Sequence, residues 1–314
     1  MQVPIDRRDF LKDSFRGGFG LLALGGFSHL AAAIEPFKRA GTPRLMLSLA
    51  AYSFRQYFIH GGEKAKIGVD PAKRIDLFQF IDFCAEHGCE GTELTSYYFP
   101  AELTEQYLIK LKRHAFLRGI AISGTAVGNT FTLPKVEERA AQIASVKKWV
   151  DYAAIMGAPH IRIFAGSAQG VSKDEAKKLS IAAIEECADY AGQKGIFLGL
   201  ENHGGIVATP EEVLEIIRAV KSPWFGVNLD TGNFQTDDPY QSLAQCAPYA
   251  VNVQIKSEIH RRGQKNELAD LARLAKILRD ANYQGYVALE YEAAEDPWTA
   301  VPGLLKRLKE LFAS

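Results

Sequence analysis

Four apolar segments in the second half of the chain each end in a side chain that carries oxygen. The segment Leu198–Gly205 reads LGLENHGG, so Glu201 directly follows a run of mostly apolar residues. The other three segments end in Asp230, Gln254 and Glu290. Carboxylates that converge on one point repel one another unless a cation neutralises them, so the pattern predicts a divalent metal site. The plain alternative is a set of solvated strand ends.

Short apolar runs alternate with longer helical patterns from residue 45 to the end of the chain. The expected strands are 45–52, 91–97, 121–127, 160–165, 197–201, 225–230, 251–256 and 286–291. The expected helices are 74–87, 104–118, 136–156, 173–194, 210–220, 239–247, 267–281 and 298–312. About eight alternations over ~270 residues are typical of a closed (β/α)8 TIM barrel, which we predict as a single α/β domain. An open doubly wound sheet would usually carry a glycine-rich loop after its first strand, and residues 51–55 read AYSFR instead.

The predicted barrel brings the four strand ends together. The functional face of such a barrel lies at the carboxyl ends of its strands. Side chains alternate along a strand, so Glu201 and His203 share one face while Asn202 points the other way. We therefore expect the oxygen-bearing residues to meet at one height in the barrel mouth.

The composition excludes several classes of protein. The chain has 314 residues, 47% of them hydrophobic, and its 37 basic residues balance its 37 acidic residues. A nucleic-acid-binding protein usually has a basic excess, so a small neutral or anionic substrate is favoured over nucleic acid. The four cysteines are interpreted as buried thiols, with one disulfide as the alternative. The oligomeric state stays open, with a homo-oligomer among the alternatives.

The first 33 residues differ in pattern from the rest. Arg7 and Arg8 precede an apolar run that ends in three alanines, which resembles a twin-arginine export signal. We expect a signal peptide over 1–33, a short linker over 34–44 and the barrel over 45–314. The resemblance implies export to the periplasm or cell envelope, with no stable membrane span after cleavage. A short N-terminal anchor or a buried helix is the alternative.

The strand-end motifs resemble a known family. ENHGG, NLDTGN, VQIK and LEYE stand on the fifth to eighth expected strands, and together they resemble the xylose isomerase-like TIM-barrel superfamily in its sugar isomerase/epimerase branch. The resemblance implies one divalent ion held by Glu, Asp, His and Glu, with the two glutamates moving the substrate proton. Glu201, Asp230 and Glu290 match this set, and Gln254 stands where the family usually has histidine.

Gln254 alters the expected metal chemistry. An amide oxygen in place of an imidazole makes the ligand set of Glu201, Asp230, Gln254 and Glu290 entirely oxygen. Such a set favours Mn2+ or Mg2+, tolerates Co2+ and suits Zn2+ less well. The same change would also explain a weakened or lost metal site.

Four further residues are candidates for substrate binding. His203 shares the face of Glu201, and Lys256 and Arg162 lie on expected strands. Glu93 matches a glutamate that relatives often carry near the substrate. The alternative for His203 is a rim histidine, and for the two cations it is pairing with carboxylates. Aromatic residues at strand ends, Tyr97 among them, are assigned to packing.

These observations lead to a metal-dependent sugar isomerase or epimerase that abstracts a proton next to a carbonyl group and forms an enediolate. Glu201 and Glu290 are the expected catalytic bases. Export favours a non-phosphorylated sugar. The alternatives are a lyase or dehydratase of the inosose dehydratase or 3-keto-glycoside-eliminating kind, and a non-catalytic sugar-binding barrel. A barrel endonuclease is disfavoured, because it would need a basic groove and many histidines.

Overall fold

The computed structural model describes residues 34–61 and 69–313. The expected signal peptide, including Arg7 and Arg8, lies outside the described residues and stays a prediction.

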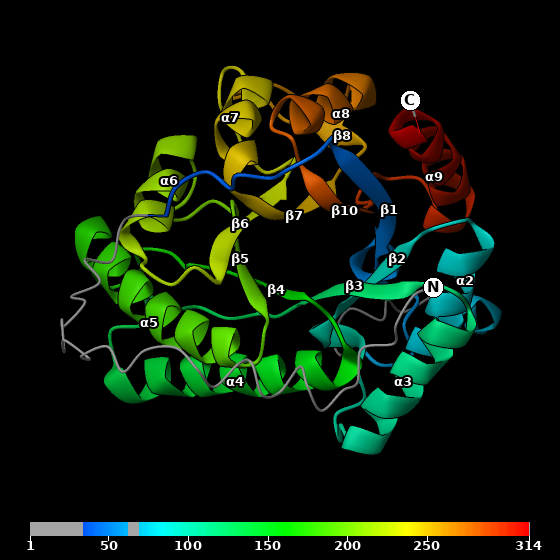
Figure 1. Cartoon of the computed structure of the whole chain (residues 1–314), viewed down its shortest axis with the longest axis horizontal. Helices are drawn as coiled ribbons and strands as arrows, with labels where there is room; N and C mark the ends of the chain where they lie inside the picture. Colours follow the sequence, from blue (N-terminus) through cyan, green and yellow to red (C-terminus); the bar gives the residue numbers. More distant parts are fainter. Residues whose placement is uncertain (1–33, 62–68, 314) are drawn as a thin grey trace, which may run out of the picture. The chain divides into compact units, whose positions relative to one another are not determined.

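Eight parallel strands of the described chain close into a barrel, in the order β1-β10-β7-β6-β5-β4-β3-β2 (Figure 1). Their bounds are β1 Arg44–Ala50, β2 Gly91–Thr95, β3 Ala121–Ala126, β4 His160–Ile163, β5 Phe197–Glu201, β6 Phe225–Asp230, β7 Ala250–Ile255 and β10 Gln284–Leu289. Leu198 and Leu200 on β5 are fully buried and alternate with Gly199 and Glu201. This alternation fits a strand with one side toward the helices and the other toward the barrel interior. The predicted single-domain (β/α)8 barrel is confirmed.

A helix follows each barrel strand and packs on the outside of the ring (Figure 1). The helices are α2 Leu77–Glu86, α3 Glu105–Leu117, α4 Val136–Met156, α5 Lys173–Gln193, α6 Pro210–Ala219, α7 Pro239–Cys246, α8 Leu271–Asp280 and α9 Pro297–Ala313. Leu271, Leu274 and Leu278 of α8 are buried at the three- and four-residue spacing of one helix face. The outer core is therefore the layer between the strands and these helices.

The loop after β7 differs from the expected helix. Residues 267 and 268 form a short strand, β9 Glu267–Leu268, which pairs in antiparallel fashion with β8 Glu258–Ile259. Helix α8 begins later because Asp270 caps it, its side chain accepting a hydrogen bond from the backbone N–H of Arg273. The expected start at 267 was thus wrong by four residues, and the chain gains a hairpin at the carboxyl end of the barrel.

Six barrel strands end one or two residues earlier than expected, and the ends of β1 and β10 are the two that bear on the mouth. Strand β1 stops at Ala50, and Ala51–Phe54 form the 3-10 turn η2. Strand β10 stops at Leu289, so Glu290 is the first residue of the following loop. The backbone N–H of Glu290 still donates to the carbonyl of Ile255 at 2.9 Å, and this bond keeps the residue in line with the strand. Glu290 therefore keeps its expected place at the barrel mouth.

The expected linker packs on the barrel. The backbone N–H of Phe37 donates to the carbonyl of Pro248, and its ring meets that of Phe197 edge-on at 6.2 Å. Asn282 donates to the carbonyl of Arg39 at 2.8 Å. Residues before β1 thus cover the starts of β5, β7 and β10.

All four cysteines are buried and free, so the interpretation as buried thiols is confirmed. None of the helices in the described ranges has the length and apolar character needed to cross a bilayer.

Gly124 on β3 gives a test of the barrel interior. A methyl group there would overlap the His160 ring, which is held by a 3.0 Å bond between Nδ1 and the carbonyl of Ser123. We expect Gly124→Ala to lower the free energy of unfolding by about 1–3 kcal/mol through overpacking. Urea denaturation measures the change.

Gly303→Ala is the matched control, because a methyl group on this exposed position of α9 meets no atom within 4 Å. This variant should be neutral or more stable by up to about 1 kcal/mol, since alanine favours a helix. Equal stability of both variants would mean that the His160 ring has room to move.

Candidate active site

A closed hydrogen-bond network fills the barrel below the mouth. Asn252 and Gln254 of β7 donate to the two carboxylate oxygens of Glu93 on β2, at 2.9 and 2.6 Å. Asn228 of β6 donates to Gln254 Oε1 at 2.7 Å and accepts from Asn252 at 2.8 Å. Burial raises the pKa of Glu93 to about 7, and the nearby charge of Glu290 adds to this rise. Both polar ends of Gln254 are thus engaged within the barrel.

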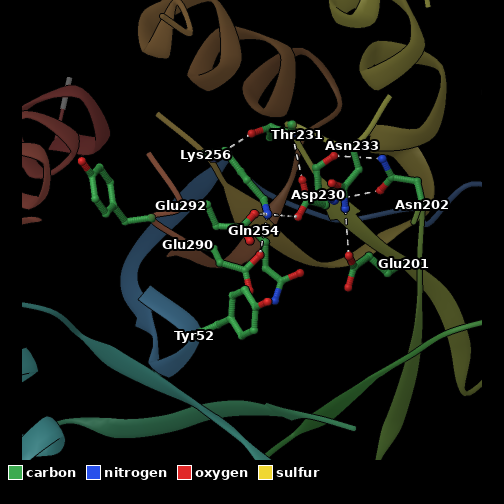
Figure 2. A network of polar contacts seen from close by, with 12 residues as sticks. Tyr52, Glu201, Asn202, Asp230, Thr231, Asn233, Gln254, Lys256, Glu290 and Glu292 are labelled. Atoms are coloured by element: carbon green, nitrogen blue, oxygen red, sulfur yellow. Dashed lines mark hydrogen bonds and ion pairs between the residues drawn. The ribbon is translucent and has the colours of Figure 1, made fainter. Parts of the chain in front are cut away.

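The Lys256 ammonium group lies among three carboxylates at the mouth (Figure 2). Its Nζ is 3.2 Å from Asp230 Oδ2 and 3.0 Å from Glu290 Oε2, and it also contacts Glu292. Burial alone would lower the pKa of Lys256, but the three negative charges outweigh it and raise this pKa well above its usual range. The side chain therefore carries a fixed positive charge.

Glu201 has a different cation. Its Oε2 lies 2.8 Å from Arg162 Nε, and the Arg162 guanidinium stacks on the Phe164 ring at 4.0 Å. Its Oε1 accepts a 2.9 Å hydrogen bond from Asn233 (Figure 2). Both oxygens of this buried carboxylate are therefore held in place, by β4 on one side and by the loop after β6 on the other.

The two glutamates have opposite pKa shifts. Burial raises the pKa of Glu201, despite the attraction of Arg162. Burial also acts on Glu290, but Lys256 and Arg162 together overcome it, and the pKa of Glu290 is lowered. Two carboxyl groups with pKa values pushed apart are suited to complementary acid and base roles.

Asp230 is fixed through its backbone and one carboxylate oxygen. Asn202 at the end of β5 exchanges two 2.9 Å hydrogen bonds with the Asp230 backbone, and Oδ1 accepts from the Gly232 N–H at 2.8 Å. The other oxygen, Oδ2, is buried without a hydrogen-bond partner and meets Lys256. Burial raises the pKa of Asp230 well above its usual range, although Lys256 opposes the rise.

These groups border a hollow of about 240 Å³, which we call the active hollow. Its lining residues are Tyr52, Tyr97, Arg162, Phe164, Glu201, His203, Asn233, Lys256, Glu290 and Glu292. Five predicted site residues are among them: Arg162, Glu201, His203, Lys256 and Glu290. Asp230 lies behind Lys256, and Gln254 and Glu93 belong to the buried network below. The structure thus separates the predicted set into a lining layer and a supporting layer.

Five lining residues were not predicted as site residues, namely Tyr52, Tyr97, Phe164, Asn233 and Glu292. Tyr97 was assigned to packing but lines the hollow, because β2 ends at Thr95 and Ser96–Tyr98 form a 3-10 turn. Tyr52 lies in the turn after β1, and Asn233 in the loop after β6. The NLDTGN motif contains a signal for Asn233, a polar side chain three residues beyond the carboxylate of the strand end.

The donor chemistry of the mouth fits a hard divalent ion. Glu201, Asp230 and Glu290 carry three carboxylates, and Asp230 Oδ2 has no hydrogen-bond partner. Within the described ranges, however, no group of three or more His, Cys, Asp or Glu side chains is arranged around a ready metal position. The Lys256 ammonium holds the oxygens of Asp230 and Glu290, and Gln254 is engaged below. An ion would have to compete with Lys256 for these oxygens.

A family model described as "Xylose isomerase-like TIM barrel" matches residues 81–311. A curated relative from Xenopus laevis, named "Putative hydroxypyruvate isomerase", is 27% identical over 177 residues. That match covers 51% of this chain and 64% of the relative, so the chain spans less than two thirds of the relative's length.

Two solved structures share the fold. A D-psicose 3-epimerase, solved with D-fructose, has 17% identity and a TM-score of 0.64, covering 83% of this chain and 89% of that one. The 3-keto-D-glucoside 4-epimerase of E. coli has 17% identity and a TM-score of 0.63, covering 85% and 100%. At these identities the likeness shows the barrel alone.

The Arg162–Glu201 pair is open to a stability test. Arg162→Met leaves a carboxylate buried without its cation, so we expect a loss of about 3–5 kcal/mol of unfolding free energy at neutral pH. Adding Glu201→Gln to this variant should recover part of the loss. Lys276→Met, which removes an exposed pair with Asp280, is the control and should change stability by less than about 1 kcal/mol. An equal loss of unfolding free energy in Arg162→Met and Lys276→Met would show that the buried pair stabilises the fold no more than an exposed pair does.

Proposed function

Since the chain belongs to the xylose isomerase-like TIM-barrel family, we propose that it is a sugar isomerase or epimerase that moves a proton at a carbon next to a carbonyl group. One observation carries the proposal. Two buried carboxylates, Glu201 and Glu290, border one hollow and are contacted by two different cations, Arg162 and Lys256.

Glu290 is the proposed base, because its lowered pKa keeps it ionised at neutral pH. It takes the proton from the carbon, and the electron pair of the broken C–H bond moves toward the carbonyl oxygen to form an enediolate. Glu201 is the proposed acid, because burial raises its pKa and makes it the more readily protonated of the two glutamates. It returns a proton to carbon, on the opposite face of the sugar in an epimerase.

Lys256 supplies positive charge beside the developing enediolate. Its ammonium group borders the active hollow and is fixed by carboxylates of β6 and of the loop after β10. A cation held in place before the reaction stabilises negative charge without reorganising. Arg162, on the Glu201 side, adds a second fixed charge. Arg162 and Lys256 then stabilise the enediolate as well as the buried carboxylates.

The charges around the active hollow favour a sugar without a phosphate group. Its two cationic side chains, Arg162 and Lys256, are already engaged by Glu201, Glu290 and Glu292. A phosphate would meet these carboxylates and find no uncommitted lysine or arginine in the lining. The aromatic rings of Tyr52 and Tyr97 instead offer flat apolar faces to a neutral ring.

We also propose that the site takes one divalent ion, Mn2+ or Mg2+, through Glu201, Asp230 and Glu290. When bound, such an ion would polarise the carbonyl and hydroxyl oxygens of the sugar. Gln254 is a weaker candidate for a ligand, because its amide oxygen accepts from Asn228.

Proton exchange tests the catalytic assignment. The wild-type protein is incubated with free ketoses and aldoses in D2O, with and without Mn2+, and deuterium uptake is followed by NMR. We expect Glu201→Gln and Glu290→Gln each to slow uptake by about 10²–10⁴-fold, the usual contribution of one acid/base group. Glu295→Gln, which changes an exposed residue of the loop after β10, should keep the wild-type rate.

Deuterium uptake at the wild-type rate in both glutamine variants would contradict the assignment of Glu201 and Glu290 as acid and base. The products separate the alternatives, because an isomerase or epimerase yields a sugar of equal mass and a lyase yields a product of lower mass. A barrel that only binds sugar would show saturable binding without any exchange.

Competition with Lys256 tests the metal proposal by binding alone. Lys256→Met frees the oxygens of Asp230 and Glu290, so we expect it to bind Mn2+ at least about tenfold more tightly than the wild type. Calorimetry measures the affinity. At a concentration of 100 Kd, Mn2+ should add about 2.7 kcal/mol of unfolding free energy. Lys265→Met, on an exposed lysine, is the control; no Mn2+ binding in any of the three proteins would refute the site.

A further inference from the structure

Beside the active hollow lies a second hollow of about 420 Å³, which shares two lining residues with it and which we call the side hollow. Its lining residues are His203, Gly204, Ala208, Thr209, Asn233, Gln235 and Arg262. His203 and Asn233 line both hollows, and Asn233 also bonds to Glu201. A ligand seated against Glu201 therefore has an adjoining space beyond these two residues.

The two volumes suit a ligand of two parts. The active hollow, at about 240 Å³, is smaller than the roughly 300–1,000 Å³ of typical small-molecule pockets, and it suits a single sugar ring. The side hollow is larger than the active hollow and contains none of the paired acid/base residues. The extra space is thus available for binding but not for proton transfer.

The side hollow presents mostly uncharged polar groups. Asn233, Gln235 and Thr209 offer amide and hydroxyl groups, which both donate and accept hydrogen bonds. Its arginine, Arg262, is 3.8 Å from Asp237 and donates to the carbonyl of Gln235 at 3.5 Å. Sugar hydroxyl groups have the same dual hydrogen-bonding character.

An anionic ligand is disfavoured there. Helix α6 begins beside the side hollow, and a free helix N-terminus would attract a phosphate. Here the Glu212 carboxylate already accepts from the backbone N–H groups of Ala208 and Thr209, at 3.0 and 3.3 Å. Although Lys173 pairs with Glu212, the backbone N–H groups are already occupied, and Asp237 lies beside Arg262, so the site does not favour a second anion.

The walls of the side hollow are tied together by backbone bonds. The N–H of Arg262, in the β8–β9 hairpin, donates to the carbonyl of Thr236 in the loop after β6 at 3.1 Å. Arg261 donates to the carbonyl of Asp237, also at 3.1 Å. The hairpin therefore holds Arg262 against the Gln235 loop before any ligand arrives.

We propose that the side hollow is a subsite for a second, uncharged sugar unit, so that the substrate is a glycoside and not a free monosaccharide. This inference rests on the proposed function of the active hollow. The reacting keto-sugar occupies the active hollow, and the unit linked to it bonds to Gln235, Thr209 and Arg262.

Paired substrates test the subsite. D-Fructose is compared with its glucosides turanose and isomaltulose, and 3-keto-D-glucose with 3-keto-trehalose. We expect at least one glucosylated sugar to exceed its parent about tenfold in kcat/KM for deuterium exchange, the effect of one or two added hydrogen bonds. Calorimetry on the same pairs measures binding apart from turnover.

Two variants and a control locate the effect. Ala208→Phe fills the side hollow, and Gln235→Ala with Arg262→Ala removes its polar groups. Both should abolish the preference for the glucoside and keep the parent sugar within about twofold. Lys265→Ala removes a cation from the same hairpin outside the side hollow and should keep the preference. Thermal unfolding checks that each variant is folded.

The outcomes separate the two proposals. Equal rates and equal affinities for free and glucosylated sugars, unchanged by Ala208→Phe, would overturn the subsite while leaving proton transfer intact. No exchange on any sugar would overturn the proposed function. In that case a binding preference for glucosides that Ala208→Phe abolishes would still support the subsite, and its absence would refute it.

Discussion

The site depends on the cost of burying negative charge at the barrel mouth. Glu201, Asp230 and Glu290 are each no more than 5% exposed, and carboxylates this buried must be paired or protonated. Arg162 and Lys256 meet this requirement from two different strands, so the mouth is divided into two ion-paired halves. Lys256 and Arg162 together lower the pKa of Glu290, whereas burial outweighs the attraction of Arg162 at Glu201, so the two glutamates are unequal. One fold thus obtains an acid and a base from the same kind of side chain.

The buried network below the mouth determines which inward side chain near the end of β7 can contact the carboxylates of the mouth. Glu93 accepts hydrogen bonds from Gln254 and Asn252, and Asn228 bonds to both of these residues and completes the network. With Gln254 engaged below, Lys256, the first residue after β7, is the side chain that reaches the carboxylates. A histidine in place of Gln254 would have different donor and acceptor positions, and the network could not close in the same way. The engagement of Gln254 and the position of Lys256 are therefore parts of one arrangement.

The sequence predicted the barrel and half of the residues that line the active hollow. The alternation along a strand places Glu201, Asp230 and Arg162 inward without knowledge of any contact. The same alternation places Glu93 and Gln254 inward, but it does not give their height along the barrel axis. That height decides whether a side chain lines the hollow or lies below it. Asn233 and Arg262 lie in loops, where no periodicity fixes direction. The hairpin that carries Arg262 was missed because its second strand, Glu267–Leu268, fell within the expected helix 267–281.

This division between strands and loops bears on how the site selects its substrate. Residues that carry charge come from strand ends, where the barrel fixes their positions. Residues that line the side hollow come mainly from the loops after β5, β6 and β7, which are held to one another by bonds such as Arg262 to Thr236. Loops tolerate change far better than a closed barrel, so the proton-transfer groups and the selecting groups are free to vary separately. A change in the β8–β9 hairpin would then alter which glycoside the site accepts without moving Glu201 or Glu290.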